Sequence, residues 1–157
     1  MDFLPVGGYM FEVQSKNGIE FMFIKLPRAW AVFSTRGGGL SSYPYSTLNL
    51  ALHVGDDDMA VLGNRRKFAQ AVGFSFEDVV CAQQVHGCEI RTVGANERGR
   101  GTKDYGDALP ETDGMITCDK RVVLAAFFAD CVPVYVVDPV KGAVGLAHAG
   151  WKGTLNE

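Results

Sequence analysis

The sequence predicts an α+β fold with several short strands and a single long helix. Apolar runs of strand length recur along the chain, and glycine, asparagine, aspartate or proline separates them. Only the segment from about residue 57 to residue 73 combines helical spacing of apolar residues with a capping residue at each end. With 47% hydrophobic and 21% charged residues, the 157-residue chain has the composition of one globular domain.

The first part of the chain predicts three strands. Residues 11–14 and 19–24 flank Asn17-Gly18, a strong hairpin signal, and residues 30–34 form a third apolar run. Arg36 and the glycines at 37–39 follow it. This segment predicts either a flexible turn or a backbone concavity that binds an anion.

The predicted helix begins after Asp56 or Asp57 and ends at Gly73. Its core-facing side is expected to consist of the residues that share one helical face: Val61, Leu62, Phe68, Ala69 and Val72. The polar positions are expected to point elsewhere: Asn64, Arg65, Lys67 and Gln70. Contact of Arg65 or Arg66 with an anion is the alternative to a solvated face.

The rest of the chain predicts more strands and one long loop. The strands are expected at 79–83, 90–93, 113–117, 122–128, 134–137 and 144–147. Residues 94–112 form a polar loop long enough to be a mobile rim or lid. Residues 150–154 resemble the start of a helix that Thr154 would cap. We therefore expect residues 1–157 to be a single domain truncated at its C-terminus.

Composition argues against several kinds of partner. A formal net charge of −3 gives no basis for binding nucleic acid or acidic membranes, and no apolar run approaches the roughly 20 residues of a membrane span. The N-terminus lacks a secretory signal pattern and the four cysteines form no CxxC pair, so reduced thiols and a cytoplasmic location are expected. Cys81, Cys88 and Cys118 are expected to be small buried hydrophobes.

Three residues combine into a candidate reactive site: His86, Cys131 and His148. Each lies where an apolar run gives way to small residues. Two imidazoles and a thiolate suit zinc and leave a fourth position open for water. The alternative is a cysteine nucleophile activated by a histidine. A multicopper cluster is excluded, because three histidines without a His-x-His pair cannot furnish it.

Seven motifs then occur in order from about Trp30 onward. They are Ser34-Thr35-Arg36-Gly37-Gly38, Ser46-Thr47-Leu48-Asn49-Leu50, His53-Val54-Gly55-Asp56, Asn64-Arg65, Gln84-Val85-His86-Gly87, Ala129-Asp130-Cys131-Val132-Pro133 and His148-Ala149-Gly150-Trp151-Lys152-Gly153. Together they resemble the YfiH/YlmD family, also called the laccase-domain or polyphenol oxidase family. The bacillus-type YlmD branch is the most similar.

The resemblance implies an α+β sandwich with mixed β-sheets packed between helices, related to a toxin-type cysteine hydrolase fold. It implies a metal triad of His86, Cys131 and His148, with zinc as cofactor and copper as a substitute metal. The implied activity is phosphorolysis of adenosine, inosine, guanosine and methylthioadenosine, and deamination of adenosine. Copper-dependent phenol oxidation and peptidoglycan-precursor editing are alternatives that the family also suggests. The partners would be a purine nucleoside and phosphate, and the oligomeric state stays open.

Four further residues are candidates for the reaction. Asp130, beside Cys131, is either a proton shuttle or a hydrogen-bond partner of a ligand histidine. Arg36 would hold phosphate. Asn49 and Lys152 are weaker candidates for contact with nucleoside or phosphate. The glutamate signature of zinc nucleobase deaminases is absent, so a proton shuttle for deamination has no assigned residue.

Overall fold

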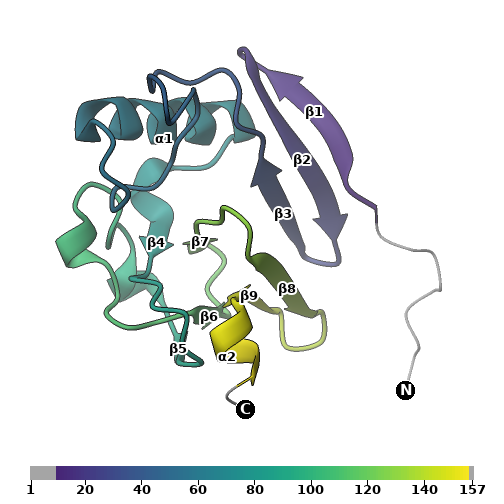
Figure 1. The fold of residues 1–157 in the computed structure, drawn as a ribbon. Coiled ribbons are helices and arrows are strands. Elements are labelled where there is room, and N and C mark those ends of the chain that lie inside the picture. The colour runs from purple at the N-terminus through teal and green to yellow at the C-terminus, as the bar shows by residue number, and fades with distance from the viewer. Residues whose placement is uncertain (1–9, 156–157) are drawn as a thin grey trace.

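Three β-sheets and one long helix make up residues 10–155, the part of the chain that the computed structural model describes (Figure 1). β1 (Glu12–Lys16), β2 (Ile19–Leu26) and β3 (Ala29–Ser34) form an antiparallel sheet. β4 (Val79–Cys81) pairs in parallel with β7 (Val123–Ala125). The third sheet has the order β5-β6-β9-β8, with bounds β5 (Ile90–Thr92), β6 (Gly114–Thr117), β8 (Val132–Asp138) and β9 (Ala143–Ala149).

The helices are few. α1 (Asp58–Val72) is the long one, and α2 (Trp151–Leu155) is a short helix directly after β9. Three 3₁₀ turns complete the set: η1 (Phe76–Asp78), η2 (Ala95–Glu97) and η3 (Tyr105–Asp107). The prediction of a mixed α+β fold with several sheets is confirmed. The relation to cysteine hydrolases stays a prediction.

The β1–β2 hairpin forms where Asn17-Gly18 predicted it. Lys16 pairs with Ile19, which leaves only Asn17 and Gly18 in the loop. Both have positive φ, 54° and 75°, the backbone of a type I′ turn that matches the twist of the strands. Asparagine and glycine adopt this conformation at low cost, so the turn chemistry sets the register of the hairpin.

The ends of α1 also lie where the capping residues predicted them. The side chain of Asp57 accepts a hydrogen bond from the Met59 amide, and Gly73 adopts the left-handed conformation at φ 99°. α1 packs on the β1–β3 sheet. The core there consists of Ile19, Phe21, Leu48 and Ala71, with Phe23, Val32, Leu50, Phe68 and Val72 packed against it.

The prediction that Asn64 and Arg65 point away from the core is wrong. Asn64 is fully buried, and its amide bonds the loop that precedes α1. Arg65 is 8% exposed and donates to the carbonyls of Leu50, Gly101 and Thr102. The guanidinium stays buried because its donors meet main-chain oxygens from two loops. Arg65 is therefore a structural clamp rather than a solvated residue or an anion contact.

The long segment 94–112 packs against this clamp instead of forming an open lid. Its buried residues include Thr102, Ala108, Leu109 and Thr112. Its main chain bonds the last residue of β4 twice: the Cys81 amide donates to Arg100 O, and the Leu109 amide donates to Cys81 O. A second core links this segment to the sheets and consists of Val80, Ala82, Val93, Leu109, Met115 and Val122, with Leu124 beside it.

The four-stranded sheet is mixed. β5 and β6 run in parallel, whereas β9 is antiparallel to both β6 and β8. The turn between β8 and β9 is closed by the Asp138 side chain, which accepts the amides of Val140 and Lys141. At the other end of this hairpin, Val132 pairs with Ala149, so the residue before β8 lies beside the end of β9.

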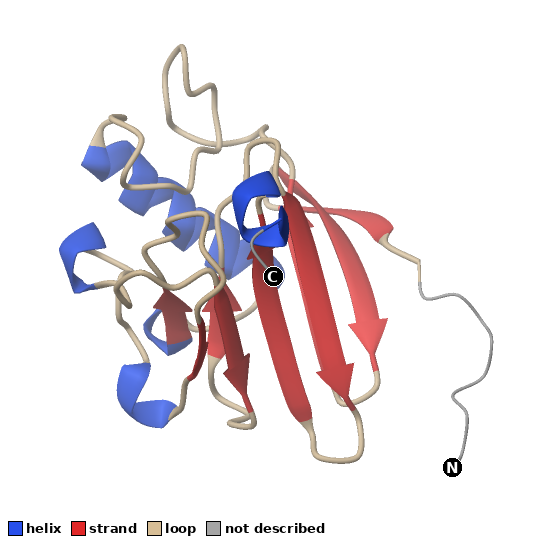
Figure 2. Cartoon of the chain, turned by 60° about the horizontal axis from the view of Figure 1, so that its bottom comes forward, coloured by secondary structure: helices blue, strands red, loops and turns tan. Residues whose placement is uncertain are grey.

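The C-terminal helix begins before the residue that the sequence offers as its cap. α2 begins at Trp151, so Thr154 lies within it and donates from its hydroxyl to the carbonyl of Gly150. Figure 2 shows α2 as a single turn at one end of the long strands. Within residues 10–155 no helix has the length and apolarity that crossing a bilayer requires.

All four cysteines are free, and their burial differs from the prediction. Cys81 is buried as expected, but Cys88 and Cys118 are exposed, so the expectation that they are buried hydrophobes is wrong. Burial raises the pKa of the Cys81 thiol to about 11, against a smaller opposing effect of Arg65. Thiolates, not thiols, react with alkylating agents.

We predict a corresponding order of thiol reactivity. Iodoacetamide at pH 8 is expected to modify Cys88 and Cys118 in the folded protein and Cys81 only after denaturation, because Cys81 is both buried and protonated. Peptide mass spectrometry over a time course measures the order. Modification of Cys81 at the rate of Cys88 in the folded protein would contradict the packing of β4.

Candidate metal centre

The three candidate residues come from separate elements that meet at one end of the β8–β9 hairpin. His86 lies on the turn after β4, Cys131 immediately precedes β8, and His148 is the penultimate residue of β9. Because Val132 pairs with Ala149, the antiparallel register itself places Cys131 next to His148. The pairing of β8 with β9 thus brings the thiol and one imidazole together.

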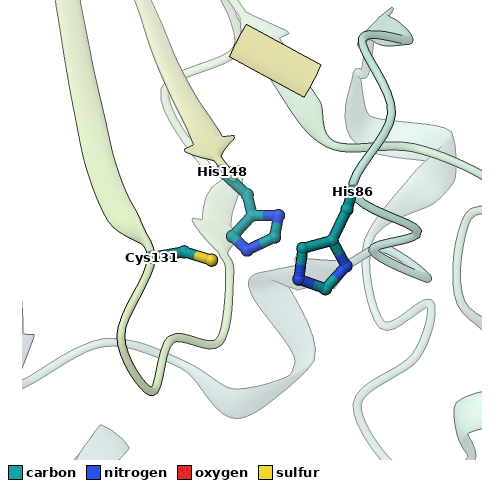
Figure 3. A group of neighbouring side chains, drawn as sticks. All are labelled: His86, Cys131 and His148. Atoms are coloured by element: carbon teal, nitrogen blue, oxygen red, sulfur yellow. The ribbon is translucent and has the colours of Figure 1, made fainter. Parts of the chain in front are cut away.

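The ligating atoms of these side chains all lie within 4.8 Å of one another. Figure 3 shows Cys131 Sγ and one nitrogen of each histidine turned toward a common space. The centroids of the two imidazole rings are 4.7 Å apart and the rings are nearly perpendicular, at 76°. His86 is exposed, Cys131 is half-buried and His148 is buried, so the group opens to solvent on the His86 side.

His148 is fixed by a buried carboxylate. Its Nδ1 lies 2.8 Å from Oδ1 of Asp113, and both side chains are almost fully buried. Burial raises the pKa of the Asp113 carboxyl, but hydrogen bonds from His148 and from the amides of residues 85–87 outweigh it and lower the pKa overall. An ionised carboxylate only accepts, so Nδ1 of His148 carries the proton and Nε2 is the nitrogen left to bind a ligand.

The turn that carries His86 closes on the same carboxylate. The amides of Val85, His86 and Gly87 donate to Asp113 at 3.1, 2.9 and 2.8 Å. His86 has φ 61°, an uncommon conformation for a residue other than glycine. The three hydrogen bonds to Asp113 therefore hold the turn in this conformation. The backbone strain falls on the residue whose imidazole faces the candidate site.

Two glycines allow α2 to approach this turn. A Cβ on Gly150 would lie 2.9 Å from His86 Cδ2 and 3.6 Å from Cys131 Sγ. A Cβ on Gly153 would lie 2.5 Å from the carbonyl oxygen of Gly87. Larger residues at either position would push the helix away from the triad, which explains why small residues follow His148.

Gln84 ties the Cys131 side of the site to the His86 side. Its amide nitrogen donates to the carbonyl of Phe127 at 2.9 Å, and its amide oxygen accepts the Phe127 amide at 2.8 Å. Phe128, the next residue, lies with its ring centroid 5.5 Å from that of His148. This paired bond holds the segment before Cys131 beside the 85–87 turn.

Of the other predicted site residues, only Asp130 has a described hydrogen bond to the triad. Asp130 is exposed, and its Oδ1 is 3.9 Å from Cys131 Sγ. The carboxylate bonded to the candidate ligand His148 is Asp113, whereas Asp130 approaches Cys131, so the roles expected of Asp130 stay predictions. Lys152 lies on α2 with its ammonium 5.6 Å above the Trp151 ring. None of the described contacts joins either of them to a histidine of the triad.

Arg36 and Asn49 belong to the loops before α1. Arg36 is exposed and donates from Nε to the carbonyl of Ser46. Asn49 accepts the Ala51 amide and donates to Ala51 O and to Asp56. Both hydrogens of its amide are used within this turn, so Asn49 has a structural role there.

Sequence reasoning missed Asp113 and Gln84. The sequence places Asp113 only at the start of an expected strand, and an acidic residue at that position is the one local signal of its role. Gln84 stands two residues before His86 in a quoted motif. Its partner, Phe127, is 43 residues away, and no local pattern indicates that pairing.

A separate apolar cleft of about 310 Å³ lies between β3, β7 and β9, with Trp30, Val123 and Leu146 in its lining. None of the triad residues lines it. The cleft and the candidate metal centre are therefore distinct features.

Comparison with known proteins identifies the family and agrees with the fold. A sequence model of the family described as "Multi-copper polyphenol oxidoreductase laccase" matches residues 30–157. Residues 30–157 thus form a laccase-like domain. The chain belongs to the YfiH/YlmD family of such domains.

Relatives with known names support the same grouping. The chain is 49% identical over 126 residues to "Purine nucleoside phosphorylase YlmD" of Geobacillus stearothermophilus, and 45% identical over 127 residues to the protein of that name from Bacillus subtilis. These matches cover 80% and 81% of the chain but 46% of each relative. The chain spans about half the length of the curated relatives it matches.

A solved structure has a similar fold. The crystal structure of YlmD from Geobacillus stearothermophilus matches with a TM-score of 0.81 and 40% identity, covering 94% of this chain and 54% of that one. The likeness therefore extends over most of the chain.

The donor set fits a metal ion. Two imidazoles and one thiol are ligands that zinc prefers in proteins, and three protein ligands are typical of catalytic zinc sites. The orientation of His148, with Nδ1 bonded to a carboxylate, is the arrangement that metal-binding histidines commonly show.

Proposed function

We propose that the chain carries the zinc centre of a purine nucleoside phosphorylase, with His86, Cys131 and His148 as ligands. The observation that carries the proposal is the convergence of these three donors within 4.8 Å. The names of the relatives support the reaction class, since each of the two bacillus-type relatives is called a purine nucleoside phosphorylase.

Zinc, when bound, would supply a Lewis acid that polarises a substrate oxygen or a water molecule. The chain's own residues prepare the position. Asp113 holds His148 with Nε2 turned into the site, and Gln84 fixes the segment that leads to Cys131. The exposed side at His86 is the side from which substrate would enter.

Phosphorolysis breaks the bond between the purine and C1′ of the ribose and joins C1′ to a phosphate oxygen. Phosphate requires fixed positive charge, and we propose Arg36 for this role. Within the described residues, Arg36 uses only Nε in a hydrogen bond, which leaves the outer edge of its guanidinium for an anion. Lys152 and Asn49 are weaker candidates, and the turn bonds of Asn49 count against it.

The metal and reaction are tested together on protein purified without added metal. About one zinc per chain is expected from a three-ligand site, together with release of hypoxanthine from inosine only when phosphate is present. With adenosine, phosphorolysis yields adenine and deamination yields inosine, so one chromatogram separates the two activities. Copper-loaded protein assayed with a phenol tests copper as the alternative metal. Metal-free protein with unchanged turnover would contradict the proposal.

A second candidate is a metal-free cysteine hydrolase acting on amide or peptidoglycan-precursor bonds. The observation that favours it is the arrangement of three side chains in series: Asp113 orients the imidazole of His148, and that imidazole adjoins the thiol of Cys131. It leaves His86 without a role. This candidate expects iodoacetamide to inactivate the protein while chelators have no effect, and the zinc proposal expects chelators to inactivate it.

A further inference from the structure

We infer that Asp113 is the positioning residue that holds both histidines of the triad in register with Cys131. The inference rests on the proposed function, since it concerns the same site. The side chain and the main chain of Asp113 together bind the two segments that carry His86 and His148, which are 62 positions apart in the sequence.

The carboxylate divides its two oxygens between the segments. Oδ1 accepts from Nδ1 of His148 and from the amide of His86, at 2.8 and 2.9 Å. Oδ2 accepts from the amides of Val85 and Gly87, at 3.1 and 2.8 Å. Four donors therefore converge on one carboxylate, and each histidine is bound through a different part of its residue: the ring of His148 and the main chain of His86.

The main chain of Asp113 reinforces this arrangement. Its carbonyl accepts the His148 amide at 2.7 Å, and its own amide donates to Glu89 at 3.0 Å. Asp113 therefore fixes the β9 backbone at His148 and closes the loop from 85 to 89. Because the residue is 6% exposed, water does not compete for these bonds.

Asparagine cannot replace this carboxylate. An amide offers one acceptor oxygen and one nitrogen that donates, whereas all four groups facing Asp113 are donors. In either orientation the amide nitrogen of Asp113→Asn would face main-chain N–H groups or the His148 ring. We therefore expect that in Asp113→Asn the His86 turn and the His148 ring are no longer held by one side chain.

The test compares Asp113→Asn with wild type and with Asp138→Asn. Asp138 is a matched control, because its carboxylate also accepts two main-chain amides but lies in the β8–β9 turn. Competition with a chromophoric chelator is expected to show zinc affinity reduced by about 10- to 100-fold in Asp113→Asn and unchanged in Asp138→Asn.

A second readout needs no metal. In ¹⁵N NMR spectra of the metal-free protein near pH 8, His148 is expected as the Nδ1–H tautomer in wild type and as a mixture of tautomers in Asp113→Asn. Should Asp113→Asn fail to fold, Asp113→Glu replaces it. Glutamate keeps the charge but is one methylene longer, so it cannot accept all four donors at their present positions.

The outcomes separate the two ideas. Zinc affinity within threefold of wild type, with an unchanged His148 tautomer, would overturn the role of Asp113. Wild-type protein that shows the Nδ1–H tautomer but binds no zinc would leave the positioning role supported and overturn the zinc function instead.

Discussion

Cys131→Ala is expected to lower zinc affinity by more than about 100-fold and to reduce nucleoside turnover to background. Loss of an outer hydrogen-bond partner of a ligand already costs about 10- to 100-fold, and loss of a ligand itself costs more. The thiol is the only sulfur donor among the three converging side chains. Cys131 is half-buried and lies immediately before β8, so alanine is expected to leave the fold intact.

The measurements are zinc content by elemental analysis, chelator competition, and phosphate-dependent release of purine base. Cys88→Ala is the matched control, because Cys88 is also a free cysteine close to His86 in sequence but is exposed. It is expected to behave as wild type in all three. Full zinc content and full turnover in Cys131→Ala would remove Cys131 from the site.

Asn64→Ala is expected to lower the free energy of unfolding by about 3 kcal/mol or more, because several buried groups lose their partners at once. Asn64 is fully buried. Its amide oxygen accepts from Leu40 N, and its nitrogen donates to Ser41 Oγ, Thr47 O and Asn49 O. Each unsatisfied buried group costs about 1–3 kcal/mol, and an alanine also leaves a small cavity.

Chemical denaturation with urea, followed by circular dichroism, measures this change. Gln70→Ala is the control on the same helix: Gln70 is exposed, and a surface substitution is expected to change stability by less than about 0.5 kcal/mol. Equal stability of the two variants would mean that the loops from 39 to 50 are not anchored by Asn64.

Elements set by local chemistry could be predicted from the sequence. The Asn17-Gly18 turn, the Asp57 cap and the Gly73 end of α1 each depend on residues within a few positions of one another. The β8–β9 hairpin likewise follows from two apolar runs and a turn, and its register places Cys131 beside His148. The third member of the triad, His86, came from its own strand-end position and from the family resemblance.

Features set by distant partners could not be predicted. The burial of Arg65 depends on the carbonyl oxygens of Gly101 and Thr102, 36 and 37 residues away. The assignment of Asp130 as partner of a ligand histidine followed from its adjacency to Cys131. Asp113 has that role because the antiparallel pairing of β6 with β9, in which Gly114 lies opposite Ala147, brings it beside His148 from 35 residues away. Sequence adjacency gives no information on which carboxylate faces a ring nitrogen.

The central claim is that His86, Cys131 and His148 together bind zinc, and X-ray absorption at the zinc edge tests it most directly. The account predicts one sulfur neighbour at about 2.3 Å and two imidazole nitrogens at about 2.0–2.1 Å in wild-type protein. In Cys131→Ala the sulfur neighbour is expected to disappear. A zinc ion surrounded only by oxygen and nitrogen in the wild type, or a sulfur neighbour that persists in Cys131→Ala, would contradict the account.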